Sequence, residues 1–98
     1  MDKIKIYETA TKKWGIHAQL LVAIEELAEL QKAICKHINR DGPIQDLWEE
    51  TADVEIMCEQ IRHIFSNVQS GYHCPKHNID EVKKQKLERL AKKLGITE

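Results

Sequence analysis

Two pairs of acidic residues stand where the surrounding pattern is apolar. Glu26 and Glu29 form the first pair, and Glu50 and Asp53 form the second. Each pair is spaced i, i+3, which places its two carboxylates on one face of a helix, one turn apart. Buried carboxylates are costly unless they are paired or bind a metal ion. The two pairs therefore predict a cage of oxygen ligands for a hard divalent cation.

The second pair is predicted to point into the apolar stripe of its own helix. At roughly 100° per residue, Glu50 and Asp53 share an arc with Leu47, Val54, Met57, Ile61, Ile64, Phe65 and Val68. Four carboxylates with no thiolate or imidazole among them favour Mg²⁺ or Mn²⁺ over zinc.

Glycine and proline divide the chain into four predicted helices. The breaks fall at Trp14-Gly15, at Asp41-Gly42-Pro43 and around Ser70-Gly71 and Cys74-Pro75. The helices are expected at about 2–12, 17–39, 44–68 and 79–94, with Asn78 or Asp80 as a cap of the last and Gly95 at its end. No stretch alternates as a strand would. The predicted fold is therefore an all-α bundle of four helices.

The second and third predicted helices are joined by a turn so short that they must be antiparallel neighbours. At roughly 1.5 Å per residue, both acidic pairs lie about 10–15 Å from that turn. We therefore expect them to face each other. The long pair also carries more apolar surface than two short helices can cover, which predicts a bundle completed by oligomerisation.

Composition narrows the class of protein. The 98 residues form one predicted domain, 1–98, with 42% hydrophobic residues and a net charge of −1. This charge balance gives no general attraction for nucleic acid polymers or membranes. No apolar run of about 18 residues and no N-terminal leader is visible. We expect a cytoplasmic protein whose three cysteines are reduced thiols.

The acidic pattern resembles the signature of the MazG-like all-α nucleoside triphosphate pyrophosphohydrolases. The matching residues are Glu25-Glu26-x-x-Glu29 followed after 20 residues by Glu50-x-x-Asp53. Upstream, Trp14-Gly15-x-His17-x-Gln19 looks like the stretch that precedes the first acidic motif in that family. Downstream, Lys83-x-x-Lys86-x-x-Arg89 is similar to the basic helix that closes the site over phosphates.

The resemblance implies hydrolysis of a nucleoside triphosphate, with a deoxy- or non-canonical nucleotide expected, to a monophosphate and pyrophosphate. It implies that the metal ligands are Glu26, Glu29, Glu50 and Asp53. It also implies that the substrate-binding residues are Trp14, His17, Gln19, Lys83, Lys86 and Arg89, and that the protein is a homodimer or homotetramer. From the chemistry alone, Glu25 and Glu29 are both candidates for accepting a proton from the attacking water.

Other interpretations of the same residues stay open. Cys35-x-His37 and His73-Cys74-x-x-His77 offer zinc ligands at irregular spacing, whereas Cys35 and Cys58 also suit small core positions. Trp14 and Trp48 suit core or interface anchors as well as base stacking. The alternative function is a non-catalytic helical module that dimerises or binds a partner, its acids being surface charge.

Overall fold

The computed structural model describes residues 1–66 and 79–97. Every element in these ranges is an α-helix, which confirms the all-α fold. The chain divides into two compact units, Met1–Ile64 and Phe65–Glu98, and each is described by itself below. No helix among the described residues is both long and apolar enough to cross a membrane.

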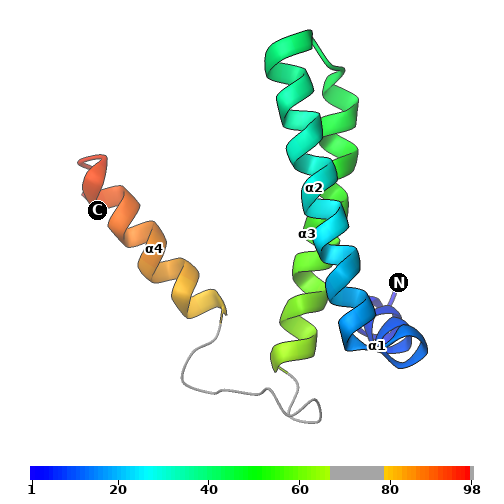
Figure 1. The fold of residues 1–98 in the computed structure, drawn as a ribbon. Helices are drawn as coiled ribbons and strands as arrows, with labels where there is room; N and C mark the ends of the chain where they lie inside the picture. The colour runs from blue at the N-terminus through cyan, green and yellow to red at the C-terminus, as the bar shows by residue number, and fades with distance from the viewer. Residues whose placement is uncertain (67–78, 98) are drawn as a thin grey trace. The chain divides into compact units, whose positions relative to one another are not determined.

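The helices begin and end close to the predicted positions (Figure 1). They are α1 (Lys3–Trp14), α2 (Ile16–Arg40), α3 (Ile44–Ser66) and α4 (Ile79–Lys93). The last two residues of the expected third helix, 67 and 68, and the expected cap Asn78 lie outside the described residues. Asp80 is in the first turn of α4 and does not cap it.

Gly15 separates α1 from α2. Its N–H closes α1 by donating to the carbonyl of Thr11 at 2.8 Å, and its own carbonyl accepts from Gln19 at 3.2 Å. The backbone there has φ 90° and ψ 157°, a combination that is open to glycine and strained for residues with a Cβ. The change of direction between the two helices therefore depends on this residue.

Replacing Gly15 with Ala is expected to lower the free energy of unfolding by about 1–3 kcal/mol. No atom lies within 4 Å of the position that the added Cβ would take, so the cost is conformational and not steric. Urea denaturation followed by circular dichroism measures it. An unchanged midpoint would show that the α1–α2 junction does not need this backbone conformation.

The turn between α2 and α3 brings the chain back alongside the last turn of α2. Asp41 is left-handed, with φ 52° and ψ 41°, and its N–H donates to the carbonyl of Lys36. The N–H of Gly42 donates to the same carbonyl at 3.0 Å. A Cβ on Gly42 would lie 3.0 Å from the Cβ of Lys36, so glycine permits this close return. Helix α3 thus begins at the level of Lys36 and not at the end of α2.

Helices α2 and α3 run antiparallel and in contact, as predicted (Figure 1). The buried and half-buried residues on one side of α2 recur at intervals of four and three residues, which is the spacing of a single helix face. We call this set the seam of α2: Gln19, Ala23, Glu26, Leu30 and Ala33. Buried residues of α3 are Met57, Gln60 and Ile64. The carboxamides of Gln19 and Gln60 are thus buried among small and aliphatic side chains, and the carboxylate of Glu26 is half-buried beside them.

Helix α1 packs against α2 and is tied to α3 by side-chain contacts. Tyr7 is its buried residue. Lys3 Nζ donates to Glu59 Oε1 at 2.8 Å, and His63 Nε2 lies 3.7 Å from Glu8 Oε1. Asp2 caps the helix, since its Oδ1 accepts from the N–H of Lys5 at 3.1 Å. Together these contacts fix α1 across the ends of the long helices.

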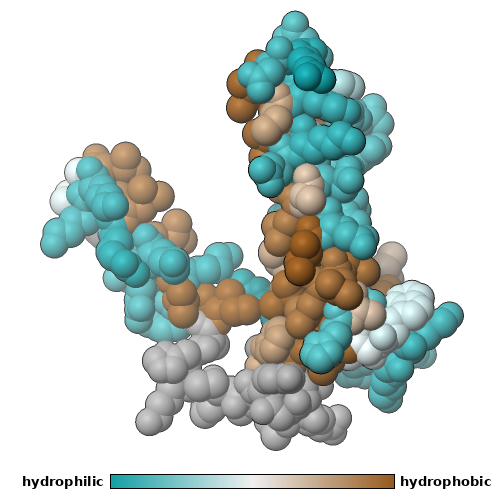
Figure 2. All heavy atoms as spheres, in the orientation of Figure 1, coloured by the Kyte–Doolittle hydropathy of each residue, from teal (hydrophilic) through white to brown (hydrophobic). Residues whose placement is uncertain are grey.

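Many large apolar side chains of α2 and α3 are exposed. On the face shown in Figure 2, hydrophobic residues gather over the part of the pair nearest α1. Trp14 and Trp48 are 59% and 66% exposed, so neither is buried in a core formed by the described residues.

The alternative interpretation of Cys35 and Cys58 as small core residues does not hold within the described part of the chain, because both are exposed. Periodicity identified the buried face of α3, which includes Met57 and Ile64, but on α2 large apolar residues such as Ile24 and Ile38 are exposed and the buried face is the seam.

The second unit contains α4, none of whose residues is buried. Gly95 ends the helix as predicted, with φ 74°. The N–H of Ile96 donates to Ala91 at 2.9 Å and the N–H of Gly95 donates to Lys92 at 3.2 Å. This pair of bonds is the Schellman arrangement, which satisfies carbonyls at a helix end.

Candidate metal centre

Three of the four predicted ligands meet between α2 and α3. Glu26 from α2 and Glu50 and Asp53 from α3 each offer a carboxylate oxygen, and these oxygens all lie within 4.8 Å of one another. Glu26 and Glu50 are half-buried, and Asp53 is exposed. We call these residues the carboxylate cluster. Its opening toward solvent at Asp53 is compatible with entry of a hydrated ion.

The turn explains why these residues meet. Glu26 lies ten residues before Lys36, where the chain turns back, and Asp53 lies nine residues after Ile44, where α3 begins. At 1.5 Å per residue these positions are level, to within about 2 Å. Glu26 also belongs to the seam of α2, between Ala23 and Leu30. Its side chain is therefore directed at α3.

Burial and mutual repulsion both act on the cluster. Burial raises the pKa of Glu26, and the charge of Asp53, a hydrogen bond with Asp53 and the charge of Glu50 raise it further. Burial also raises the pKa of Glu50, and next comes the charge of Asp53. A nearby cation would reverse the electrostatic part of these shifts, because it favours the ionised form. A divalent cation would thus offset the repulsion between the carboxylates of the cluster.

One oxygen of Glu50 has no hydrogen-bond partner among the described residues. Oε2 is shielded from solvent and unpaired. Buried polar atoms are paired in the great majority of cases, so such an atom calls for an explanation. A metal ligand is one such explanation, since a carboxylate oxygen is what Mg²⁺ and Mn²⁺ prefer. The residues present therefore fit a hard cation.

Glu29 is the predicted ligand that the structure leaves outside the close cluster. It is exposed, because the seam of α2 continues from Glu26 to Leu30 and passes it by. A step of three residues turns the side chain by about 60° away from Glu26. Its charge still raises the pKa of both Glu26 and Glu50. Glu29 thus borders the cluster, and Glu25 is exposed on the same helix. The role of either residue as a proton acceptor remains a prediction.

The residues predicted to contact a base lie around the junction of α1 and α2. Trp14 is exposed and Lys13 Nζ lies 5.4 Å from the centre of its ring. His17 is exposed, whereas Gln19 is only 7% exposed and belongs to the seam. Its amide is therefore covered by the protein in this conformation. Gln19 precedes Glu26 by seven positions, which is about 10 Å along the helix.

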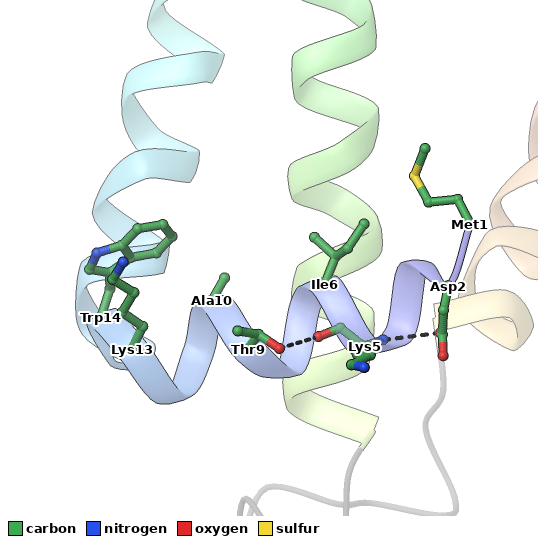
Figure 3. Close-up of a pocket in the computed structure, with 8 residues that line it drawn as sticks. All are labelled: Met1, Asp2, Lys5, Ile6, Thr9, Ala10, Lys13 and Trp14. Atoms are coloured by element: carbon green, nitrogen blue, oxygen red, sulfur yellow. Dashed lines mark hydrogen bonds between the residues drawn. The ribbon is translucent and has the colours of Figure 1, made fainter.

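A hollow of about 530 Å³ lies along α1, beside Trp14 (Figure 3). Ile6 and Ala10 line it together with Met1 and the aliphatic parts of polar side chains. Asp2 and Thr9 use their side chains to hydrogen-bond backbone groups of the same helix. The lining is thus mainly apolar, and it does not include the carboxylate cluster.

The predicted phosphate-binding residues lie on α4. Lys83, Lys86 and Arg89 are exposed and follow one another every three residues, so they share one side of the helix. They belong to the second unit, and their role in binding phosphate remains a prediction.

The zinc interpretation gains no support from the part of the chain that is described. Cys35 and His37 belong to no group there of three or more potential ligands. The Nδ1 atom of His37 instead lies 3.1 Å from the carbonyl of Gly42. The motif His73-Cys74-x-x-His77 lies outside the described residues.

Sequence reasoning missed Gln60. Its side chain is 3% exposed and its Nε2 has no hydrogen-bond partner among the described residues. It stands seven residues after Asp53, hence on the same face of α3 and two turns further on. That spacing could have identified it as a buried polar residue in line with the cluster.

Replacing Glu50 with Gln is expected to raise the stability of the metal-free protein at pH 7. A raised pKa means that the folded state binds more protons than the unfolded state above the ordinary value of 4.5. Stability therefore falls as the pH rises from that value through the raised pKa. The variant should lose this part of the pH dependence, measured by urea denaturation between pH 4 and about 8 in the presence of a chelator.

Glu59→Gln is the control of opposite sign. The hydrogen bond from Lys3 lowers the pKa of Glu59, so this carboxylate stabilises the fold above 4.5 and its effect is lost as the pH falls through the lowered pKa. This variant should be less stable than the original at pH 7. Equal changes in stability for the two variants would contradict the conclusion that burial and repulsion destabilise the ionised cluster.

No protein-family model, no curated protein and no solved structure matches this chain. The geometry and electrostatics of the carboxylate cluster are therefore the basis on which a function can be proposed.

Proposed function

We propose that the protein is a MazG-like, Mg²⁺-dependent nucleoside triphosphate pyrophosphohydrolase. The observation that supports this best is the carboxylate cluster, in which Glu26, Glu50 and Asp53 converge from two helices. The proposed reaction adds water at the α-phosphorus and breaks its bond to the bridging oxygen. The products are a nucleoside monophosphate and pyrophosphate.

Within this proposal, Glu26, Glu50 and Asp53 hold the cation, and Glu29 adds negative charge at their border. Bound Mg²⁺, or Mn²⁺, would neutralise phosphate charge and lower the pKa of a coordinated water. Glu25 and Glu29 are the carboxylates left to accept the proton of the attacking water. Lys83, Lys86 and Arg89 supply the positive charge that the phosphates farther from the metal require.

Trp14 and His17 are exposed and are the candidates for contact with the base of the substrate. Gln19 would need a change of side-chain conformation to reach a ligand, because it is buried. The expected substrates are deoxy- or non-canonical nucleoside triphosphates. The expected assembly is a homodimer or homotetramer, since exposed apolar residues on α2 and α3 leave the bundle incomplete.

A panel of canonical and modified nucleoside triphosphates, with Mg²⁺ present, tests the proposal through release of pyrophosphate. The expected result is turnover of at least one nucleotide, with loss of activity when the metal is removed by a chelator. Release of orthophosphate in place of pyrophosphate would show attack at a different phosphorus. No turnover across the panel with either Mg²⁺ or Mn²⁺ would overturn the proposed reaction.

The second candidate function is a non-catalytic helical module that dimerises or binds a partner. The exposed apolar side chains of α2, such as Ile24 and Ile38 at 62% and 72%, favour it. The two candidates differ in what the cluster does. In a non-catalytic module Glu50→Gln would leave the affinity for Mg²⁺ or Mn²⁺ nearly unchanged, whereas in the hydrolase it would lower that affinity.

A further inference from the structure

Two carboxamides are buried at the same level of the facing helices α2 and α3. Gln19 is 7% exposed and Gln60 is 3% exposed. Gln19 stands seven positions before Glu26 on α2, and Gln60 stands seven positions after Asp53 on α3. Because the helices are antiparallel and the two acids are level, the two carboxamides are level as well. They lie two helix turns, about 10 Å, from the carboxylate cluster.

Gln60 lies where three helices meet. At roughly 100° per residue, Glu59 and His63 stand on one side of it, and their side chains contact α1. The buried Met57 and Ile64 stand on its other side, on the face of α3 that carries the carboxylate cluster and meets α2. The carboxamide is therefore enclosed between the contact with α1 and the contact with α2.

The amide nitrogen of Gln60 has no partner in this enclosed position. Its Nε2 atom is shielded from solvent and makes no hydrogen bond to any described residue. An amide nitrogen carries two N–H donors. Leaving such donors buried and unpaired costs free energy, which makes unpaired groups of this kind rare. The position therefore suits a ligand that presents two neighbouring acceptors.

A 6-oxopurine presents such a pair of acceptors. The N7 and O6 atoms of guanine are adjacent and both accept hydrogen bonds, and hypoxanthine has the same two atoms. Adenine keeps N7 but carries an amino group in place of O6, which sets a donor against a donor. Cytosine presents an amino group and thymine a single carbonyl oxygen on the corresponding edge. A 6-oxopurine is thus the base that pairs both N–H groups.

We propose that Gln60 selects a 6-oxopurine base in the substrate, with its Nε2 donating to N7 and O6 and with Gln19 lining the same subsite. This inference rests on the proposed hydrolase activity and names the class of its substrate. A nucleotide whose phosphates meet a cation at the carboxylate cluster extends its sugar and base over a length comparable with the two helix turns that lead to Gln60.

Helix α1 controls access to this subsite. Lys3 Nζ donates to Glu59 Oε1 at 2.8 Å next to Gln60, and this ion pair is exposed to solvent. Exposed ion pairs contribute little to stability. The helix continues into α2 through Gly15, whose backbone tolerates changes of direction that other residues resist. Movement of α1 about Gly15 would open both carboxamides to a base.

Gln60→Met tests the selection through turnover. The original protein is expected to hydrolyse deoxyinosine triphosphate with a kcat/KM at least about tenfold above that for deoxyadenosine triphosphate. These substrates differ at the edge that Gln60 is proposed to contact. The variant should lose the preference by losing activity toward the inosine nucleotide. Gln45→Met makes the same change at an exposed position of α3 and should keep the preference.

Binding of the monophosphates separates this subsite from the reaction. Calorimetric titration with deoxyinosine monophosphate and deoxyadenosine monophosphate needs no hydrolysis, so it gives a result even if no triphosphate is turned over. The original protein and Gln45→Met should bind the inosine nucleotide at least about tenfold more tightly, and Gln60→Met should bind both nucleotides alike. Equal binding of the two nucleotides by the original protein would overturn the proposal.

Stability separates recognition from a structural role of Gln60. Methionine removes the unpaired donors at similar size, so the midpoint of urea denaturation should stay the same or rise. The affinity for Mg²⁺ should not change, because the carboxylate cluster is intact. A variant that folds well and keeps the original preference between the two nucleotides would show that Gln60 is only a buried side chain, and would refute its role in selection.

Discussion

Glu50→Gln and Asp53→Asn are each expected to lower the rate of pyrophosphate release at least about tenfold, on the order of 1.4 kcal/mol of barrier. Both residues place a carboxylate oxygen within 4.8 Å of the other members of the cluster. Each substitution keeps the size of the side chain but removes a charge that we propose holds the cation. Positioning and electrostatic stabilisation are the contributions that a protein makes to the transfer of a phosphoryl group, and a bound cation serves both. Steady-state assays at saturating Mg²⁺ measure the effect.

Glu55→Gln is the matched control. Glu55 is an exposed carboxylate on α3, two residues after Asp53, and it lies outside the cluster. Its replacement removes one negative charge from the same helix without touching a proposed ligand. Activity should stay near that of the original protein. If Glu50→Gln and Glu55→Gln keep equal and full activity, the cluster has no part in the reaction.

Mg²⁺ is expected to stabilise the folded protein strongly. A ligand that binds only the folded state adds about 2.7 kcal/mol at a concentration one hundred times its dissociation constant. For a chain of this size, that corresponds to a rise in melting temperature of roughly 10 °C or more. The rise should be largest near pH 7, because the raised pKa values of Glu26 and Glu50 make protons compete with the metal as the pH falls.

Calorimetric titration supplies the dissociation constant, and thermal denaturation with and without the metal supplies the shift. Glu55→Gln should show the same shift as the original protein, and Glu50→Gln should show a much smaller one. A shift of equal size in all three proteins would mean that the ion binds elsewhere. This measurement needs no substrate, so it separates failure of the metal site from failure to find the right nucleotide.

The sequence was sufficient to predict the helices and most of the cluster, because both depend on local spacing. The i, i+3 pairs and the short turn placed Glu26, Glu50 and Asp53 on facing helices. Glu29 could not be separated from Glu26 in this way, since its position depends on how α2 is rotated against α3. That rotation follows from the packing of small residues such as Ala23 and Ala33, which carry little weight in an apolar pattern.

Burial was harder to predict than position. Cys35 lies at the edge of an apolar face, and a pattern on one helix does not reveal whether another helix covers that face. The same limit explains why Gln60 was missed. Whether a carboxamide is buried depends on which neighbouring helices cover it, and its own polarity does not reveal this. Lys83, Lys86 and Arg89 pose a related difficulty. Their spacing is local, whereas any role at the cluster depends on contacts distant in sequence.

The return of the chain at Lys36 and Gly42 makes the length of each helix arm a constraint on evolution. The nine residues between Glu26 and Lys36 and the eight between Ile44 and Asp53 act as matched spacers. Many exposed spacer residues can be exchanged without moving the carboxylates. Loss or gain of a single residue in one arm would instead rotate its carboxylates by about 100°. In related genes, substitutions should therefore be common between these points, and insertions or deletions should be rare.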